Sequence, residues 1–272
     1  MYLVFMDGCD VPAPARAGLG PLRAIGGVLV PESEVAGFDT DLRRIRREAG
    51  LAASDRIGWA AGAALSDRDR RLHVHTTVLA AAMRREIASV VVVADSASRA
   101  GADREELVRT FLGRVAVFLQ ERGEIAVVVA DPADDGLSQI ARELAEVPAD
   151  PDVPYPPETR IVLPVLSAPS RHVPHLQLAS LVVGATTAVV AGQPEAAPVA
   201  PLLTRLMARR IQHTAGGAGL VLQPERYNIL HWGFGERWHY DPTLRQRVQL
   251  PHRDWDYGTS DGLPPAAHQT VA

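Results

Sequence analysis

The feature that most constrains the fold of this chain is the alternation of short, almost wholly apolar runs with longer amphipathic segments. The longer segments repeat apolar residues at helical spacing, as Val35, Phe38 and Leu42 do within residues 33–50. Strands as apolar as these runs are typical of a sheet that is covered by helices on both faces. The pattern predicts an α/β fold with strands at residues 2–7, 22–31, 89–95, 124–131, 159–166 and 220–224.

The most apolar helical segment, residues 176–192, bears on whether the chain is expected in a membrane. It is shorter than a typical membrane span, and Gln177, Ser180 and two threonines interrupt it. We therefore expect a buried helix, and we expect no contact with a membrane. The apolar start of the chain is too short for a signal peptide, which predicts a cytoplasmic location. The other helices are expected at residues 33–50, 66–88, 103–122, 135–146 and 199–213.

Composition excludes several kinds of chemistry. The chain has no lysine, so all 28 basic residues are arginine, and its net charge is −4. Schiff bases, lysine general bases and the lysine of a phosphate-binding loop are therefore excluded. The single cysteine, Cys9, excludes intrachain disulfides and cysteine-rich metal clusters. Neither glycine-containing stretch, 20–27 or 214–219, joins a strand to a helix as dinucleotide binding requires, so no organic cofactor is expected.

Three of the predicted strands end at an aspartate: Asp7, Asp95 and Asp131. In open α/β sheets, ligands bind beyond the carboxyl ends of the strands, so these acids mark a candidate site. The alternative is that each one simply forms a turn, which is an ordinary role for aspartate. For Asp95 we expect that structural role, at the loop leading to the next helix.

Five stretches, taken together, resemble a known family. In order and spacing they are similar to the landmarks of the bacterial domain-of-unknown-function family numbered 3800, which is usually placed in the ribonuclease-H-like superfamily. They span roughly residues 2 to 235. The stretches are FMDGCD (5–10), IGGVLVPES (25–33), VVVADPADD (127–135), LQLASLVVGA (176–185) and GLVLQPERYNILHWGFG (219–235).

The resemblance implies a ribonuclease-H-like mixed sheet with helices on both faces and with the acids of its first and middle strands side by side. It also implies cleavage of phosphodiesters by Mg²⁺ or Mn²⁺ ions held between carboxylates. Such hard ions prefer oxygen ligands. Asp7 and Asp131 map onto the catalytic, metal-holding acids, and nucleic acid is then the expected substrate.

The chain departs from the family motifs at three positions. Gly8 and Cys9 stand where the family has glutamate and serine, and Ser180 replaces an aspartate of the late helix. Nearby acids that would supply replacement charge are Asp10, Asp134 and Asp135. Two alternatives to a nuclease-like hydrolase therefore stay open. One is a catalytically decayed binding or scaffolding module, and the other is a small-molecule enzyme of a specialised pathway that uses the same pocket.

The start of the late helix carries the remaining candidate residues. Gln177 and Ser180 lie one helical turn apart, so they would share a face directed at the two acids. His172 and His175 come just before them and would favour Mn, Fe or Zn if they joined a metal site. The alternatives are the polar edge of a packed helix for the first pair and loop or cap residues for the histidines.

The chain is expected to divide into an α/β domain, residues 1–225, and a C-terminal arm, residues 226–272. The arm is rich in aromatic residues, among them Trp232, Trp238 and Trp255. Such side chains can stack on bases, but they also suit an arm that docks on its own domain or on a second subunit as a homodimer. The last dozen residues are expected to be disordered.

Overall fold

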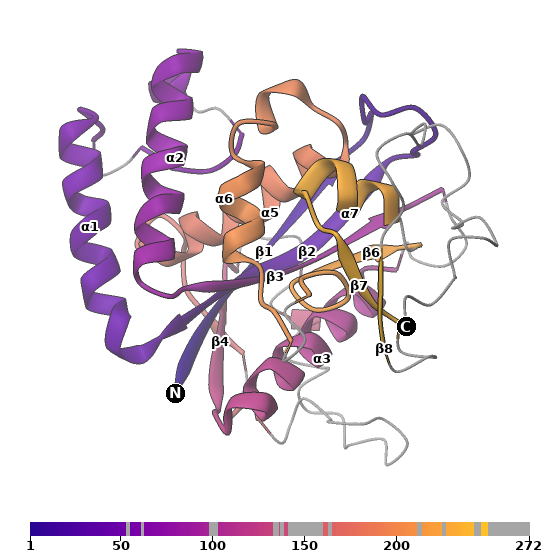
Figure 1. Cartoon of the computed structure of the whole chain (residues 1–272). Helices are drawn as coiled ribbons and strands as arrows, with labels where there is room; N and C mark the ends of the chain where they lie inside the picture. Colours follow the sequence, from indigo (N-terminus) through magenta and orange to yellow (C-terminus); the bar gives the residue numbers. More distant parts are fainter. Residues whose placement is uncertain are drawn as a thin grey trace.

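A six-stranded mixed sheet with strand order β5-β4-β1-β2-β3-β6 forms the centre of the protein (Figure 1). In this computed structural model the described residues are 1–52, 55–60, 63–97, 103–132, 136, 139–140, 160–162, 165–210, 214–224, 227–241 and 246–249. The predicted α/β class is confirmed. The strands of the sheet are β1 (Tyr2–Val11), β2 (Leu22–Pro31), β3 (Ala88–Asp95), β4 (Ala126–Ala130), β5 (Leu166–Ser167) and β6 (Leu220–Gln223).

The pairing of β1 determines which residues meet at the edge of the sheet. On one side β1 pairs with β2 in antiparallel fashion along its whole length, from Tyr2 to Val11. On the other side it pairs with β4 in parallel, and this pairing ends where Met6 lies opposite Ala130. The predicted end of the first strand at residue 7 is therefore wrong, because β2 continues to satisfy the backbone of β1 beyond that point.

The strand predicted at residues 159–166 is also different in the structure. Ile161 forms an isolated bridge with Ala126, and the only strand in the described part of this segment is the two-residue β5. Of the helix predicted at 135–146, residues 136, 139 and 140 alone are described. The expected helix at 199–213 ends early, at Leu206.

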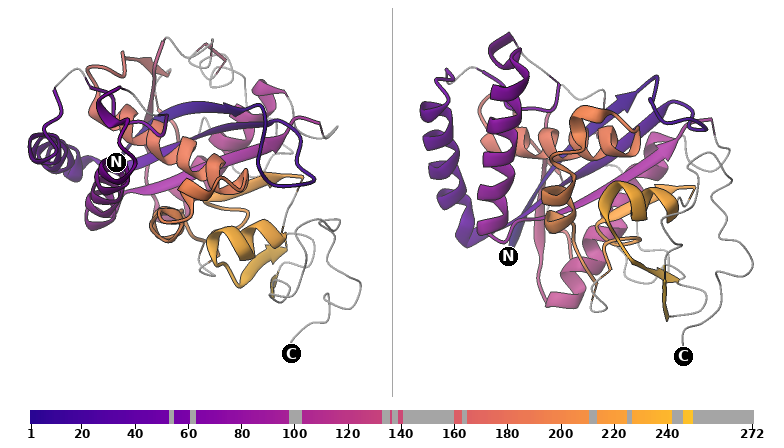
Figure 2. Two further views of the ribbon diagram at one scale, coloured as in Figure 1. Left: turned by 90° about the horizontal axis from the view of Figure 1, so that it is seen from above. Right: turned by 45° about the horizontal axis from the view of Figure 1, so that its top comes forward.

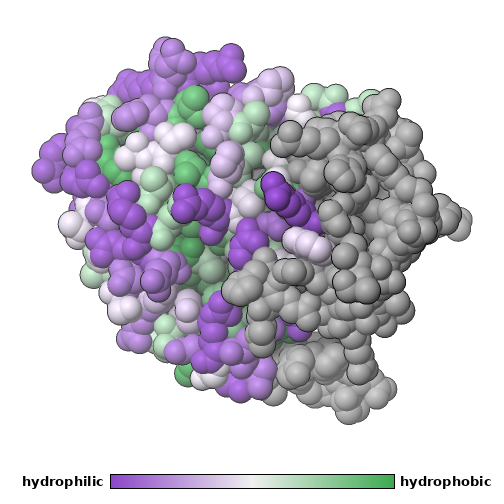
Figure 3. Space-filling view, in the orientation of Figure 1, coloured by the Kyte–Doolittle hydropathy of each residue, from purple (hydrophilic) through white to green (hydrophobic). Residues whose placement is uncertain are grey.

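Helices cover both faces of the sheet (Figure 2). On one face, Phe5 of β1 packs in a core that includes residues of α1, α2, α5, α6 and α7. On the other face, Val4 and Met6 pack with residues of α3. Hydrophilic residues dominate the side of the surface over α1 (Figure 3). The α-helices are α1 (Val35–Glu48), α2 (Arg68–Arg84), α3 (Arg104–Arg122), α5 (Pro174–Val190), α6 (Ala200–Leu206) and α7 (Tyr227–Phe234).

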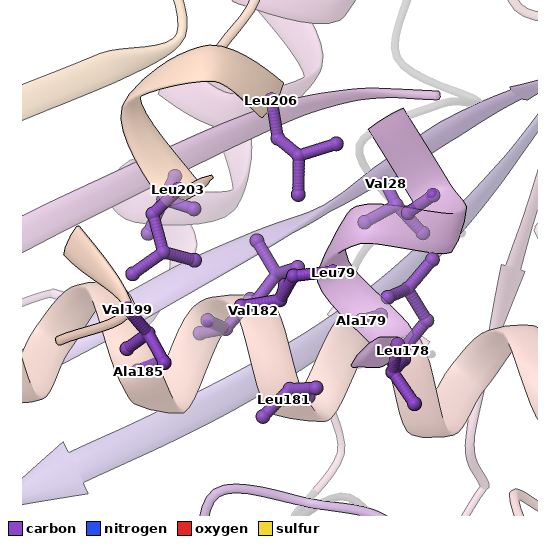
Figure 4. Packing of buried hydrophobic residues seen from close by; sticks show 14 of the residues in the cluster. Val28, Leu79, Leu178, Ala179, Leu181, Val182, Ala185, Val199, Leu203 and Leu206 are labelled. Atoms are coloured by element: carbon purple, nitrogen blue, oxygen red, sulfur yellow. The ribbon is translucent and has the colours of Figure 1, made fainter. Parts of the chain in front are cut away.

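Helix α5 is the central element of the larger core. All of its residues except Pro174 and Ser180 are buried, which confirms the predicted buried helix. Its side chains pack against α2, α6 and the sheet, and Figure 4 shows Val182 and Ala185 among residues of these neighbours. No helix in the described ranges is long and apolar enough to cross a membrane.

The described part of the C-terminal segment packs on the same core. Ile229, Leu230 and Phe234 of α7 are buried in the cluster that contains α5 and α6. Residues 250–272, including Trp255, lie outside the described residues, so the division after residue 225 remains a prediction. The remaining elements are the hairpin β7 (Trp238–Asp241) and β8 (Gln246–Gln249) and the short 3₁₀ helices η1 (Glu32–Glu34), η2 (Ala63–Leu65) and η4 (Pro194–Ala196).

Candidate functional site

A pocket of about 280 Å³ lies where β1 and β4 stop pairing. Asp7 and Asp131 each come directly after the last residue of the parallel β1–β4 pairing, and both line this pocket. The structure therefore brings together two acids that are 124 positions apart in the sequence (131 − 7). The other walls come from the loop of residues 55–60 and from the first turns of α5.

Backbone amides orient both carboxylates. Asp7 Oδ1 accepts a hydrogen bond from its neighbour Gly8 N at 2.9 Å. Asp131 Oδ2 accepts one from Ser170 N, also at 2.9 Å. Both acids are half-buried, so their side chains lie between the packed sheet and the open pocket. Each carboxylate is held in place without being sealed from ligands in the pocket.

Gln177 ties the walls of the pocket to one another. Its Oε1 accepts hydrogen bonds from Arg46 Nη2 at 2.5 Å and from Ile57 N at 3.1 Å. Its Nε2 donates to Ser170 O at 3.1 Å. Since Ser170 N also bonds Asp131, one buried amide connects the 55–60 loop, α5 and a catalytic candidate. Gln177 lines the pocket as predicted, but its oxygen already has two donors.

Two further helices fix the loop of residues 55–60. Arg46 of α1 donates to Asp55 O at 2.8 Å, and burial lowers the pKa of this arginine. The Nε2 of His75 in α2 lies 3.1 Å from Gly58 O, to which it donates because a carbonyl can only accept. Burial lowers the pKa of His75 to about 4, so the ring is neutral at pH 7.

The loop approaches α5 most closely at Ser180 and Gly184. A Cβ added to Gly58 would lie 3.2 Å from Ser180 Oγ, and one added to Gly184 would lie 2.6 Å from Cβ of Trp59. Glycine at position 184 therefore allows the loop to pack against the helix. Ser180 lines the pocket, as its helical spacing from Gln177 predicts.

Three residues predicted for the site lie outside the pocket, and a fourth, His175, is described in the next paragraph. Asp10 is exposed and pairs with Arg23 at 3.1 Å and Arg104 at 3.6 Å. Cys9 is further along β1 and packs against the larger core. His172 is exposed, and its Nε2 accepts a hydrogen bond from its neighbour Arg171. None of these residues lines the pocket.

His175 is the clearest difference from the predicted site. It is buried, it stacks on Phe5 with ring centroids 4.8 Å apart, and its Nε2 lies 3.2 Å from Val35 O. Two helical positions separate it from Gln177, so the two side chains point in different directions. Burial lowers the pKa of His175. It is a core residue, which is why it does not reach the two aspartates.

The described acids and histidines offer no larger metal cluster. Among the described residues, no group of three or more histidine, cysteine, aspartate and glutamate side chains is arranged to hold a metal ion. The predicted ligand Asp135, like Asp134, lies outside those residues. What the structure places together is the pair Asp7 and Asp131, with Ser180 of α5 lining the same pocket.

Asp95, the third strand-end acid, does not line the pocket. It is buried, with Oδ2 accepting from Gly20 N at 3.2 Å and Oδ1 from Ala97 N at 3.0 Å. Its carboxylate therefore joins two loops, which is the structural role expected for it.

Arg56 is a pocket residue that the sequence did not reveal. It lies exposed in the 55–60 loop and lines the pocket with both aspartates. Its stretch, DRIGWAAG, has only the composition of a loop, and no spacing connects it to Asp7 or Asp131.

Comparison with known proteins adds no family name: no family model matches the chain, and no match is found among curated proteins.

Proposed function

We propose that the protein is a divergent ribonuclease-H-like hydrolase that cleaves phosphodiesters with the help of a divalent cation. The observation that supports this most directly is that Asp7 and Asp131, which lie where the parallel pairing of β1 and β4 ends, line one pocket. Two carboxylates that share a pocket repel each other, and a bound cation relieves that repulsion. Sheets of this class bind ligands at the carboxyl ends of parallel strands, and both acids lie where the parallel β1–β4 pairing ends.

The residues of the pocket fit Mg²⁺ or Mn²⁺. Asp7 and Asp131 supply carboxylate oxygens, which hard divalent ions prefer, and the Ser180 hydroxyl is a further oxygen of the same pocket. Mg²⁺ commonly binds through one or two carboxylates and keeps several waters, so this small set is sufficient for one ion. A cation bound there would lower the pKa of a bound water and polarise a phosphoryl oxygen.

The chain's own residues supply the geometry of the reaction. Backbone amides of Gly8 and Ser170 orient the two carboxylates before any substrate binds. Gln177 holds the 55–60 loop in position relative to residue 170, because it accepts a hydrogen bond from Ile57 N and donates one to Ser170 O. A preorganised site of this kind needs little rearrangement when charge develops in the transition state.

A second candidate is a module that binds phosphate groups without cleaving them. It is favoured by Ser180, a neutral residue where the family resemblance places an acid, and by the close approach of Gly58 to its hydroxyl. A neutral hydroxyl is a weaker ligand than a bridging carboxylate, so this site would hold fewer cations than a two-metal nuclease.

Titration of Mn²⁺ by calorimetry, together with hydrolysis of bis(p-nitrophenyl) phosphate and of labelled DNA and RNA, separates the two candidates. The hydrolase should bind Mn²⁺ and lose both binding and cleavage in Asp7→Asn. Asp10→Asn is the matched control, because this acid lies on the same strand but outside the pocket.

Two outcomes would count against catalysis. If the wild-type protein and Asp7→Asn give the same product patterns, the proposed hydrolase is wrong. If the wild-type protein shows no heat with Mn²⁺, the binding module is the better description of the pocket.

A further inference from the structure

We infer that Arg56 is the residue that binds the substrate's phosphate group, and that it makes the pocket specific for a small phosphodiester or for one exposed phosphodiester at the end of a strand. The inference rests on the proposed function, since it assigns a substrate contact in the same pocket. It adds a residue that neither the strand-end acids nor the family resemblance indicates.

The side chain of Arg56 has no other role within the described ranges. It forms no hydrogen bond or ion pair with another described residue, although it lines the pocket and is exposed. By contrast, Arg46 on the same side is engaged by two backbone carbonyls and by Gln177. An arginine beside a pocket that forms no internal bond keeps all five donor hydrogens for a ligand.

The backbone that carries Arg56 is fixed on both sides. Asp55 O accepts a hydrogen bond from Arg46 at 2.8 Å, and Ile57 N donates to Gln177 Oε1 at 3.1 Å. Gly58 O is held by His75 one residue further on. Three helices thus position a residue whose own side chain bonds none of the described residues, so little backbone freedom is lost when a ligand binds.

Charge determines the class of ligand. Among the described lining residues, Arg56 is the only cation, and it shares the pocket with the carboxylates of Asp7 and Asp131. A phosphate that enters would be repelled by those acids unless positive charge stands beside them. The planar guanidinium presents paired donors that match phosphate oxygens, and a chain without lysine has only arginine for this task.

Size limits the ligand further. At about 280 Å³ the pocket is slightly smaller than the usual range for small-molecule sites, roughly 300–1,000 Å³. It therefore suits one phosphate with a small attached group. The same phosphate could belong to a free small molecule or to the end of a nucleic acid strand, and the experiment distinguishes these two sources.

The test measures binding of inorganic phosphate and of thymidine 5′-monophosphate by calorimetry, once in EDTA and once with saturating Mn²⁺. Arg56→Ala should weaken binding by at least about tenfold, the loss expected for charge-assisted hydrogen bonds. Arg56→Lys should recover part of the affinity, because it restores the charge without the paired donors.

Arg47→Ala is the matched control. Arg47 is an exposed arginine of α1 whose side chain forms no ion pair or hydrogen bond with another described residue. It does not line the pocket, so its loss removes the same charge elsewhere. We expect the affinity of the Arg47→Ala variant for phosphate to stay within about twofold of the wild-type affinity. Thermal melts of both variants should match the wild type, since both side chains are exposed.

The inference is overturned if, in both buffers, Arg56→Ala binds phosphate as tightly as Arg47→Ala. Mn²⁺ binding is measured separately in the same variants, and Arg56→Ala should retain it. If the wild-type protein does not bind Mn²⁺, the proposed function is contradicted. The role of Arg56 is still tested in that case, because phosphate binding in EDTA does not depend on Mn²⁺. If the protein hydrolyses the p-nitrophenyl ester of thymidine 5′-monophosphate but not short oligonucleotides, the bound phosphate belongs to a small molecule. If it hydrolyses the oligonucleotides but not the ester, the bound phosphate belongs to the end of a nucleic acid strand.

Discussion

The two places where acids follow the strands of this sheet differ in what surrounds the carboxylates. Asp7 and Asp131 are half-buried and line a pocket together, whereas Asp95 is buried and both of its oxygens accept backbone amides. The parallel neighbour of β3 is β6, whose paired segment ends at Gln223 and is followed by Pro224, so the described part of that neighbour brings no second acid beside Asp95. A strand-end aspartate becomes a candidate for chemistry only when the adjacent strand brings a partner.

The two corners of the sheet, the pocket with Asp7 and Asp131 and the surroundings of Asp95, also differ in the hydrogen bonds that stabilise them. Around Asp7 and Asp131, side chains from α1, α2 and α5 join the walls across long stretches of sequence, through Arg46, His75 and Gln177. Around Asp95 the donors are the amides of two loops. The comparison indicates that the pocket corner is organised to keep its shape, and the Asp95 corner to close a connection. Four substitutions or conditions would break or sharpen this contrast.

The largest effect is expected for Asp131→Asn. Removing a carboxylate that holds the cation should lower cation-dependent hydrolysis by at least about a hundredfold without unfolding the protein. Rates at saturating Mn²⁺ and a thermal melt measure the two parts. Asp95→Asn should hydrolyse at the wild-type rate, and an equal loss in both variants would remove the distinction between the corners.

Gln177→Leu should cost about 1–3 kcal/mol of unfolding free energy, because Nη2 of Arg46 and the buried Ile57 amide lose the acceptor that they share. Urea unfolding measures this cost. Gln193→Leu is the control: Gln193 is half-buried, has no side-chain hydrogen bond that caps its helix, and should change stability by less than about 0.5 kcal/mol. Similar costs for both would mean that Gln177 does not organise the pocket walls.

Acidification should destabilise the pocket side through His75. Burial lowers its folded pKa to about 4, against about 6.5 for an unfolded chain, so the unfolded state binds the proton first. The stabilising contribution is thus complete above about pH 6.5 and is lost as the pH falls towards 4, by up to about 3 kcal/mol. His175, whose pKa is also lowered by burial, adds in the same direction.

Urea unfolding at pH 7 and pH 4.5 tests the effect, with His75→Gln as the comparison. The glutamine amide can still donate to Gly58 O but does not titrate, so this variant should lose less stability on acidification than the wild type. Equal losses in the two proteins would show that His75 is not the group that responds.

The smallest effect is expected for Asp95→Ala. Loss of the hydrogen bonds to Gly20 N and Ala97 N should cost about 1–2 kcal/mol, and phosphate binding should not change. Thermal melts and phosphate titration give the two values. A large drop in phosphate affinity would show that the Asp95 corner communicates with the pocket.

Much of the fold was predictable because apolar runs and helical periodicity are local signals. They located β1 to β4 and the buried helix α5, and with it the shared face of Gln177 and Ser180. The end of β1 was not predictable in the same way. The run of apolar residues stops at Asp7, but pairing with β2 carries the strand on to Val11.

The site was predictable only where strand ends define it. Asp7 and Asp131 follow apolar runs, so a parallel sheet places them together. His175 was misplaced because the predicted helix began at residue 176, whereas α5 begins at Pro174 and turns His175 into the core, where it stacks on Phe5. Arg56 was missed because the bonds that fix its loop come from residues 46, 75 and 177, which no local pattern relates to it.

Helix α5 has a consequence for how the protein responds to heat. The same seventeen residues fill the larger core and carry Gln177 and Ser180 into the pocket. The α5 side of the pocket therefore cannot loosen while the centre of the molecule remains intact. Inactivation on warming should coincide with global unfolding, and there should be no temperature interval in which a folded but idle protein accumulates.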